Sequence, residues 1–131
     1  MTTGIHTIAA PEGMAPPRGH YSHATRGGGL VFVSGQLPVA EDGTVLHDAA
    51  FDVQARQVLA NVAAALRGAG GSVEHLLQVR VYITDIENWP AFNEMYAQWA
   101  GDACPARAVV PVPTLHYGCA LEVEAVALSA A

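Results

Sequence analysis

The 131-residue sequence predicts an α+β fold in which two helices lie on one face of a single sheet. Two segments repeat apolar residues every three or four positions, and several others alternate apolar with polar residues. Their order along the chain is β-β-α-β-α-β-β. Two helices cover only one face of such a sheet, so we expect one domain, residues 1–131, that associates with copies of itself.

The first third of the chain predicts an irregular lead-in followed by a β-hairpin. Residues 1–18 are rich in proline and glycine, which is typical of irregular structure. Residues 21–25 predict a short strand, and the glycines at 27–29 turn the chain into a second strand that starts at residue 30. A phosphate-binding glycine loop would lead into a helix, whereas a strand follows these glycines. We therefore interpret them as a turn.

The rest of the chain supplies the helices and the remaining strands. Residues 51–66 carry the apolar stripe of an amphipathic helix, and the glycines that follow end it. Residues 78–83 alternate as a half-buried strand. Asn88 is a candidate N-cap for a second helix that runs to Trp99. Strands at 106–112 and 121–128 complete the sheet, and the last has apolar side chains on both faces, which favours cover by another subunit.

Composition and charge exclude several classes of function. The chain has 12 acidic residues, six arginines and no lysine, for a net charge of −6, so it carries no basic surface for nucleic acid. Without lysine, Schiff-base chemistry is also excluded. No apolar run approaches the roughly 20 residues of a membrane-spanning helix, and no secretory signal is evident. We expect a cytoplasmic protein that binds neither nucleic acid nor membrane.

Three charged residues are candidates for chemistry. Arg107 heads an apolar strand, where its guanidinium needs an anionic partner, either a structural carboxylate or that of a substrate. Glu122 and Glu124 alternate with apolar residues along the last strand, so both point to the same side. One of them could act as a general base, or both could form a solvated acidic face. Pairing of either acid with Arg107 across neighbouring strands would favour the general-base interpretation. The scattered histidines lack metal-ligand spacing, and Ser34 lies outside a GxSxG elbow, so neither a metal site nor a serine nucleophile is expected.

The chain resembles the RidA/YjgF family, formerly called endoribonuclease L-PSP-like, along almost its whole length. The segments that carry the resemblance occur in the family's order: GHYSHA at 19–24, LVFVSGQLP at 30–38, QARQVLANVAAALRGAG at 54–70, VRVYITD at 79–85, FNEMY at 92–96, PAR at 105–107 and LEVEAVA at 121–127. Each segment alone is weak evidence, but the ordered set is specific.

The resemblance implies a chorismate-mutase-like fold assembled as a barrel-shaped homotrimer with clefts between subunits. It also implies hydrolysis of 2-aminoacrylate-type enamines and imines to 2-oxo acids and ammonia, with no metal or organic cofactor. Arg107 matches the arginine that grips the substrate carboxylate, and it is the only cation that the resemblance places in the cleft. Glu122 matches the acid that directs the attacking water. The residues that match the remaining cleft-shaping positions are Tyr21, Ser34, Gly35 and Asn93.

Departures from the family pattern fall near the expected cleft. In this chain, His20 and His23 replace the proline and the glutamine of the family's usual Gly-Pro-Tyr-Ser-Gln motif. Val109 occupies a position that is frequently cysteine in the family, and His116 and Tyr117 occupy positions where proline and a charged residue are usual. We therefore expect substrate choice to differ from that of a general deaminase. Two alternatives stay open: a pathway-specific enzyme acting on the imine or enamine of a larger molecule, and a non-catalytic trimer that binds a small carboxylate or a partner protein. The endoribonuclease role claimed for some relatives conflicts with the acidic charge.

Overall fold

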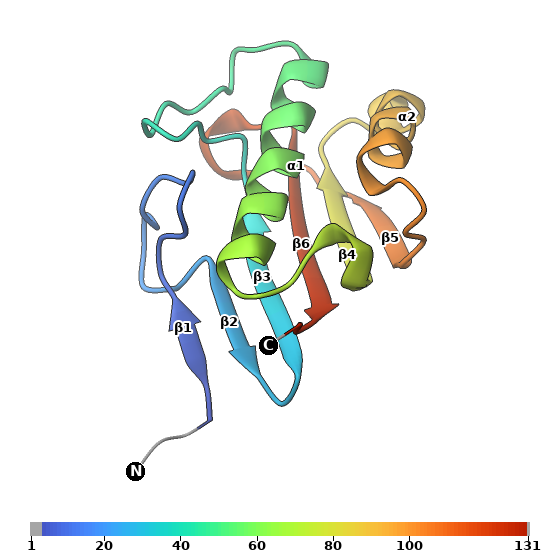
Figure 1. The fold of residues 1–131 in the computed structure, drawn as a ribbon. Coiled ribbons are helices and arrows are strands. Elements are labelled where there is room, and N and C mark those ends of the chain that lie inside the picture. Colours follow the sequence, from blue (N-terminus) through green and yellow to red (C-terminus); the bar gives the residue numbers. More distant parts are fainter. Residues whose placement is uncertain (1–3, 131) are drawn as a thin grey trace.

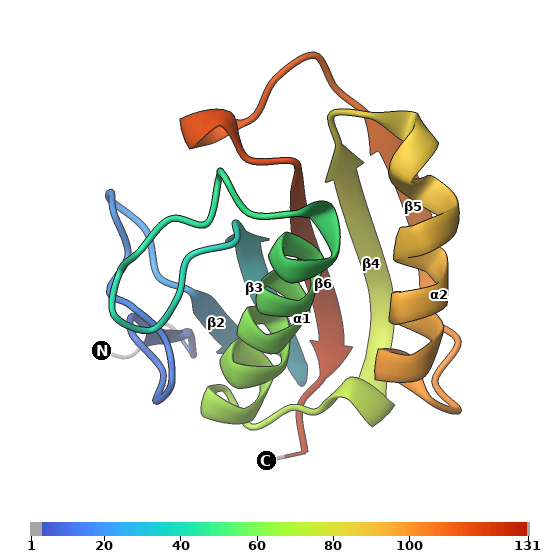
Figure 2. The same ribbon diagram turned by 90° about the horizontal axis from the view of Figure 1, so that it is seen from above.

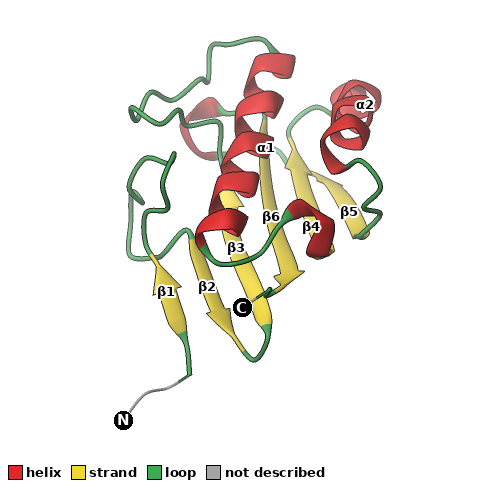
Figure 3. Ribbon diagram, viewed as in Figure 1, coloured by secondary structure: helices red, strands yellow, loops and turns green. Residues whose placement is uncertain are grey.

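The computed structural model describes residues 4–130, which form one six-stranded sheet and two α-helices. The strands are β1 (His6–Ile8), β2 (Ala24–Gly27), β3 (Leu30–Gln36), β4 (Leu76–Ile83), β5 (Ala106–Pro111) and β6 (Leu121–Leu128). They are ordered β1-β2-β3-β6-β4-β5, with β4 and β5 parallel and the other neighbours antiparallel. Helices α1 (Phe51–Gly68) and α2 (Trp89–Ala100) lie on the same face (Figures 1 and 3). The α+β prediction is confirmed.

The N-terminal segment differs from the prediction. Residues 1–18 were expected to be irregular, but β1 pairs with β2 and places Ile8 opposite Ala24. A strand of three residues is too short to show an alternating pattern, so no periodic signal predicts β1. The strand expected at residues 21–25 begins instead at Ala24, which leaves Tyr21 in the preceding loop with 47% of its surface exposed. The sheet therefore has six strands among residues 4–130 rather than five.

The core lies between the sheet and α1. Figure 2 shows α1 crossing the centre of the sheet and α2 beside it, toward β5. The apolar stripe of α1 is at most 3% exposed, and it comprises Ala55, Val58, Leu59, Val62, Ala65 and Leu66. Removing such apolar surface from water stabilises the fold by roughly 25 cal/mol per Å². Neither α-helix in the described part of the chain is long and apolar enough to span a membrane.

The opposite face of the sheet has no layer of helices. Side chains alternate along each strand, so the residues between the buried positions point to this second face. Phe32 and Leu128 are each 46% exposed there, and Val110 is 37% exposed. Large apolar side chains left exposed on one sheet face are typical of a surface that another molecule covers.

The start of α2 is where the sequence placed it, although the capping contact differs. Asn88 occupies the N-cap position, yet its side chain makes no capping hydrogen bond. The 3-10 helix η2 (Ile86–Asn88) precedes α2, and Asp85 caps it by accepting a hydrogen bond from the Glu87 backbone N–H at 3.0 Å. The side-chain cap therefore lies at the start of η2, and the N-cap of α2 at Asn88 has no side-chain hydrogen bond.

Gly68, the last residue of α1, provides a test of how the N-terminal segment packs against this helix. A Cβ atom at position 68 would lie 2.6 Å from Cβ of the buried Pro11. Alanine is the better helix former by about 1 kcal/mol, but we expect Gly68→Ala to lower the free energy of unfolding by about 1–3 kcal/mol because of this overlap. Urea denaturation measures the change, with Arg67→Ala, at an exposed neighbouring position, as the control. A stabilised Gly68→Ala variant would contradict the packing of residue 11 against α1.

Candidate functional site

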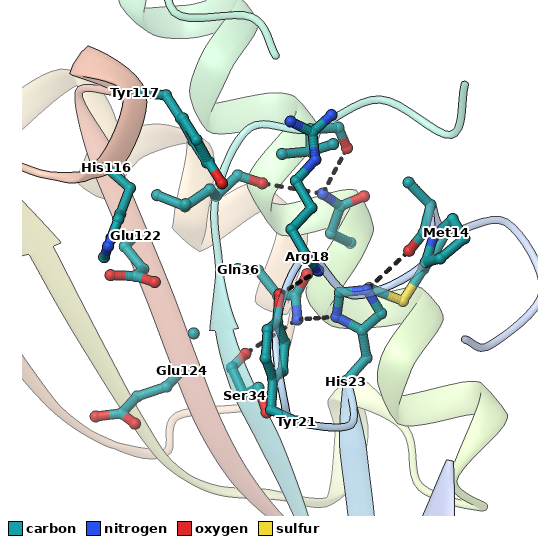
Figure 4. Close-up of a pocket in the computed structure, with 16 residues that line it drawn as sticks. Met14, Arg18, Tyr21, His23, Ser34, Gln36, His116, Tyr117, Glu122 and Glu124 are labelled. Carbon is teal, nitrogen blue, oxygen red and sulfur yellow. Dashed lines mark hydrogen bonds between the residues drawn. The ribbon is translucent and has the colours of Figure 1, made fainter. Parts of the chain in front are cut away.

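A pocket of about 490 Å³ lies at the end of the sheet where β3 finishes and β6 begins. Its walls come from the loop that precedes β2, from the end of β3 and from the 3-10 helix η3 (His116–Gly118), as Figure 4 shows. The pairing of β3 with β6 shifts register between Val33 and Gln36, so Ser34 and Gly35 leave the regular ladder at the pocket wall. Such irregularities re-aim side chains beside functional sites.

Glu122 presents a carboxylate to this pocket. Its strand partner in β4 is Tyr82, so Glu122 lies on the face of the sheet without helices. Gly35 makes room for it, because a Cβ there would lie 2.5 Å from Glu122 Oε2. Among residues 4–130 the carboxylate has no hydrogen bond or ion pair. Burial raises the pKa of Glu122 and Glu124 adds to the rise, while His116 opposes it. These carboxylate oxygens are available to a water molecule.

Glu124 shares the face of Glu122, as the alternation predicted, but it is held by neighbouring side chains. The Tyr82 hydroxyl donates to Glu124 Oε1 at 2.6 Å, and Arg80 Nη1 lies 3.4 Å from the same oxygen. The hydrogen bond to Glu124 is the main cause that raises the pKa of Tyr82. Of the two acids, Glu122 is therefore the one free to act on a bound molecule.

A buried histidine fastens the pocket loop to the end of β3. His23 Nε2 lies 2.8 Å from the Ala15 carbonyl oxygen, and Nδ1 lies 3.1 Å from Gln36 Nε2. Because a carbonyl only accepts and an amide NH₂ only donates, the proton sits on Nε2 and Nδ1 accepts. Ser34 Oγ donates to the Ser22 carbonyl at 2.6 Å. Within residues 4–130, no group of three His, Cys, Asp or Glu side chains is arranged to hold a metal ion.

Asn61 and Arg18 are among the pocket residues that were not identified from the sequence. Asn61 interrupts the apolar stripe of α1, and its Nδ2 donates to the carbonyls of Leu37 and Val39 at 3.1 and 2.9 Å. A polar residue on a buried helix face was the available signal. Arg18 lines the pocket with its guanidinium carbon 5.6 Å from the Tyr117 ring centre. It adds a cation that the resemblance did not place in the cleft.

Arg107 and Asn93 lie outside this pocket within one chain. The Arg107 guanidinium carbon is 4.7 Å from the ring centres of both Trp89 and Tyr96, on α2. Its strand partner Val79 is fully buried beneath the helices, so Arg107 faces the helix side of the sheet. Asn93 is exposed on α2. The pairing of Arg107 with Glu122 or Glu124 that the sequence left open does not occur within one chain.

Four of the expected site residues thus meet at one pocket, and they are Tyr21, Ser34, Gly35 and Glu122. In the described part of the chain, Arg107 has no carboxylate partner, so the structural ion pair weighed from the sequence is not formed there. Its guanidinium N–H groups keep their capacity to bind an anion.

The fold and the pocket define an α+β protein with one helix-covered sheet face, one uncovered face and a polar pocket at the end of the sheet. A family model described as "Endoribonuclease L-PSP" matches residues 12–129. The chain belongs to this family, the RidA/YjgF family.

Relatives match over nearly the full chain. A RutC family protein of Pyrococcus horikoshii is 37% identical, with 94% of each chain covered. The 3-aminoacrylate deaminase RutC of Acinetobacter baylyi is 34% identical over 92% of this chain and 95% of its own. The crystal structure of E. coli TdcF with bound serine superposes with a TM-score of 0.87 at 32% identity, covering 95% of this chain and all of TdcF.

The close approach of Gly35 to Glu122 leads to a testable expectation. In Gly35→Ala, the new methyl group would displace the carboxylate at the end of a flexible side chain, so the fold should keep its stability within about 1 kcal/mol. We expect any catalytic turnover at this pocket to fall, because a misplaced catalytic group loses rate steeply. Thermal unfolding together with the hydrolysis assay described below measures both effects. Full activity in the variant would mean that the position of Glu122 is unimportant.

Proposed function

We propose that this protein hydrolyses 2-aminoacrylate-type enamines and their imine tautomers to 2-oxo acids and ammonia, in clefts shared between the subunits of a homotrimer. The observation that carries the proposal is the Glu122 carboxylate, which lines the pocket without a hydrogen bond or ion pair among residues 4–130. The relative named 3-aminoacrylate deaminase and the relative solved with bound serine support a small substrate of this chemical type.

The main requirement of this reaction is a water molecule positioned against the electrophilic carbon. An enamine first takes a proton from solvent on its terminal carbon and becomes the iminium ion. Glu122 then accepts a proton from water as the water oxygen bonds to the iminium carbon, and the C=N π electrons become the lone pair of the amine nitrogen. The protonated Glu122 returns this proton to the nitrogen, the C–N bond breaks and ammonia leaves. The hydroxyl proton is lost to solvent as C=O forms, which balances the proton taken up on carbon. One water is consumed for each ammonia released.

Arg107 holds the substrate carboxylate in this proposal, and it comes from a neighbouring subunit. Within one chain Arg107 and Glu122 face opposite sides of the sheet, so one copy of the chain does not unite them. The Trp89 and Tyr96 rings hold the guanidinium plane and leave its N–H groups for a bidentate carboxylate. Burial of the uncovered sheet face in a closed ring of subunits would bring a second copy of the chain against the pocket.

The size of the pocket favours a second candidate, a pathway-specific enzyme for a larger imine. The six non-hydrogen atoms of 2-aminoacrylate would displace at most about 180 Å³, if each took the roughly 30 Å³ of a liquid water. The pocket of one chain measures about 490 Å³, which leaves space for a longer substrate. The reaction at the imine carbon would be the same, with Glu122 in the same role.

The role of Glu122 is tested by Glu122→Gln. We expect decay of the enamine formed by a threonine dehydratase to slow by about 10²–10⁴-fold, because the amide accepts no proton from water. Binding of 2-oxobutyrate, measured by calorimetry, should stay nearly intact. In the wild type, hydrolysis should fall as pH drops through a pKa above the ordinary value of 4.5, since burial raises it and only the ionised acid accepts a proton.

Glu124→Gln is the matched control, because Glu124 lies on the same face but is held by Tyr82 and Arg80. Its hydrolysis rate should remain close to that of the wild type. If Glu124→Gln abolished hydrolysis and Glu122→Gln did not, the catalytic acid would be Glu124. If neither the wild type nor any variant hydrolysed the enamine while oxo acids still bound, the non-catalytic carboxylate-binding alternative would replace this proposal.

A shared site predicts complementation between two inactive variants. Arg107→Ala should weaken 2-oxobutyrate binding at least about tenfold, and Arg107→Lys should not restore it, because an ammonium lacks the planar fork of the guanidinium. When Arg107→Ala and Glu122→Gln chains are unfolded, mixed equally and refolded, random assortment restores about a quarter of the sites in a ring oligomer.

Light scattering checks the assembly on which complementation depends. The expected mass is three times the 13.7 kDa of one chain. A monomeric mass, or mixed trimers with no recovered hydrolysis, would contradict the shared site.

A further inference from the structure

Arg18 stands out among the pocket residues because no step of the proposed reaction uses it. Of the pocket-lining residues in the described part of the chain, it is the single lysine or arginine. It comes from the loop before β2, and its backbone N–H lies 3.4 Å from the Tyr21 hydroxyl. Figure 4 shows Arg18 on one side of the pocket and Glu122 and Glu124 on the other. A cation is thus set apart from the acids.

The Arg18 side chain is held in place but keeps free donors. One guanidinium nitrogen donates to the Gly43 carbonyl, and the group lies 5.6 Å from the centre of the Tyr117 ring. Arginine has five N–H donors, and among residues 4–130 the guanidinium makes the single hydrogen bond to Gly43. The remaining donors are available to an anion.

Tyr117 is kept in an unfavourable backbone conformation at the same point. Its φ of 63° lies in the left-handed region, which non-glycine residues rarely adopt. The side chain gains no core packing in return, because it is 49% exposed and lines the pocket beside Arg18. Such strain concentrates at ligand-binding positions, and here it presents an aromatic ring against the cation.

We propose that Arg18 and Tyr117 form a subsite for a second acidic group, so that the preferred substrates are imines or enamines of dicarboxylic amino acids. The proposal rests on the proposed function, in which Arg107 of a neighbouring subunit holds the first carboxylate and Glu122 directs water to the imine carbon. The distal carboxylate then reaches the Arg18 guanidinium across the space that a three-carbon acid leaves empty. A second anion beside this cation forms charge-assisted hydrogen bonds.

The test compares two oxo acids that differ only in the distal carboxylate, 2-oxoglutarate and 2-oxopentanoate. By calorimetric titration, the wild type should bind 2-oxoglutarate about tenfold more tightly. Arg18→Gln should bring the ratio of the two dissociation constants close to one. Arg67→Gln, which removes an exposed arginine of α1 outside the pocket, should keep the wild-type ratio.

A second variant examines the strained residue. Tyr117→Gly suits the left-handed backbone and should fold at least as well as the wild type, yet lose much of the preference for 2-oxoglutarate because Arg18 loses its ring contact. Equal affinity of the wild type for both acids would overturn the subsite, as would a preference that survives in Arg18→Gln.

The enamine assay separates the two proposals. Hydrolysis without a preference for the diacid would leave the proposed function standing and remove the subsite. Preferential binding of 2-oxoglutarate through Arg18 without hydrolysis would retain the subsite and remove the enzymatic function.

Discussion

The alternation of side chains along the strands separates the two charged groups on which the proposed chemistry depends. Arg107 on β5 faces the helices, and Glu122 on β6 faces away from them, because their partners Val79 and Tyr82 lie on opposite faces of β4. No rotamer change carries a side chain through a sheet. The same alternation leaves apolar side chains on the uncovered face. Both features lead to the same inference, that the functional unit contains more than one copy of the chain.

Glu122, the acid to which we assign the proposed hydrolysis, lies in a position that disfavours its ionised form. Burial disfavours its charged form and raises its pKa. A carboxyl whose folded pKa is raised stabilises the protein at low pH, and this contribution is lost as pH rises through the raised pKa. The ionised form of Glu122, which the proposed hydrolysis requires, is therefore the form that burial disfavours. Glu124, paired with Tyr82, instead contributes to the structure of the sheet.

Polar side chains of α1 connect the core to the pocket. Gln54 donates to the Ala49 carbonyl and accepts from the Ala120 backbone N–H, so it links the loop before α1 to the start of β6. Asn61 holds the chain that leaves β3. Both side chains are about 4% exposed, and buried hydrogen bonds of this kind are costly to break. The pocket loops are thereby tied to the helix that covers the centre of the sheet.

The sequence by itself determined the α+β class, both helices, four of the strands and the family, because apolar periodicity and ordered motifs are local properties. It also placed Glu122 and Glu124 on one face. Only the tertiary structure decided that β1 joins the sheet, that Glu122 is free while Glu124 is bound, and that Arg18 and Tyr117 meet beside the pocket. These outcomes depend on contacts between segments distant in sequence, which set strand register and loop position and leave no periodic signal along the chain.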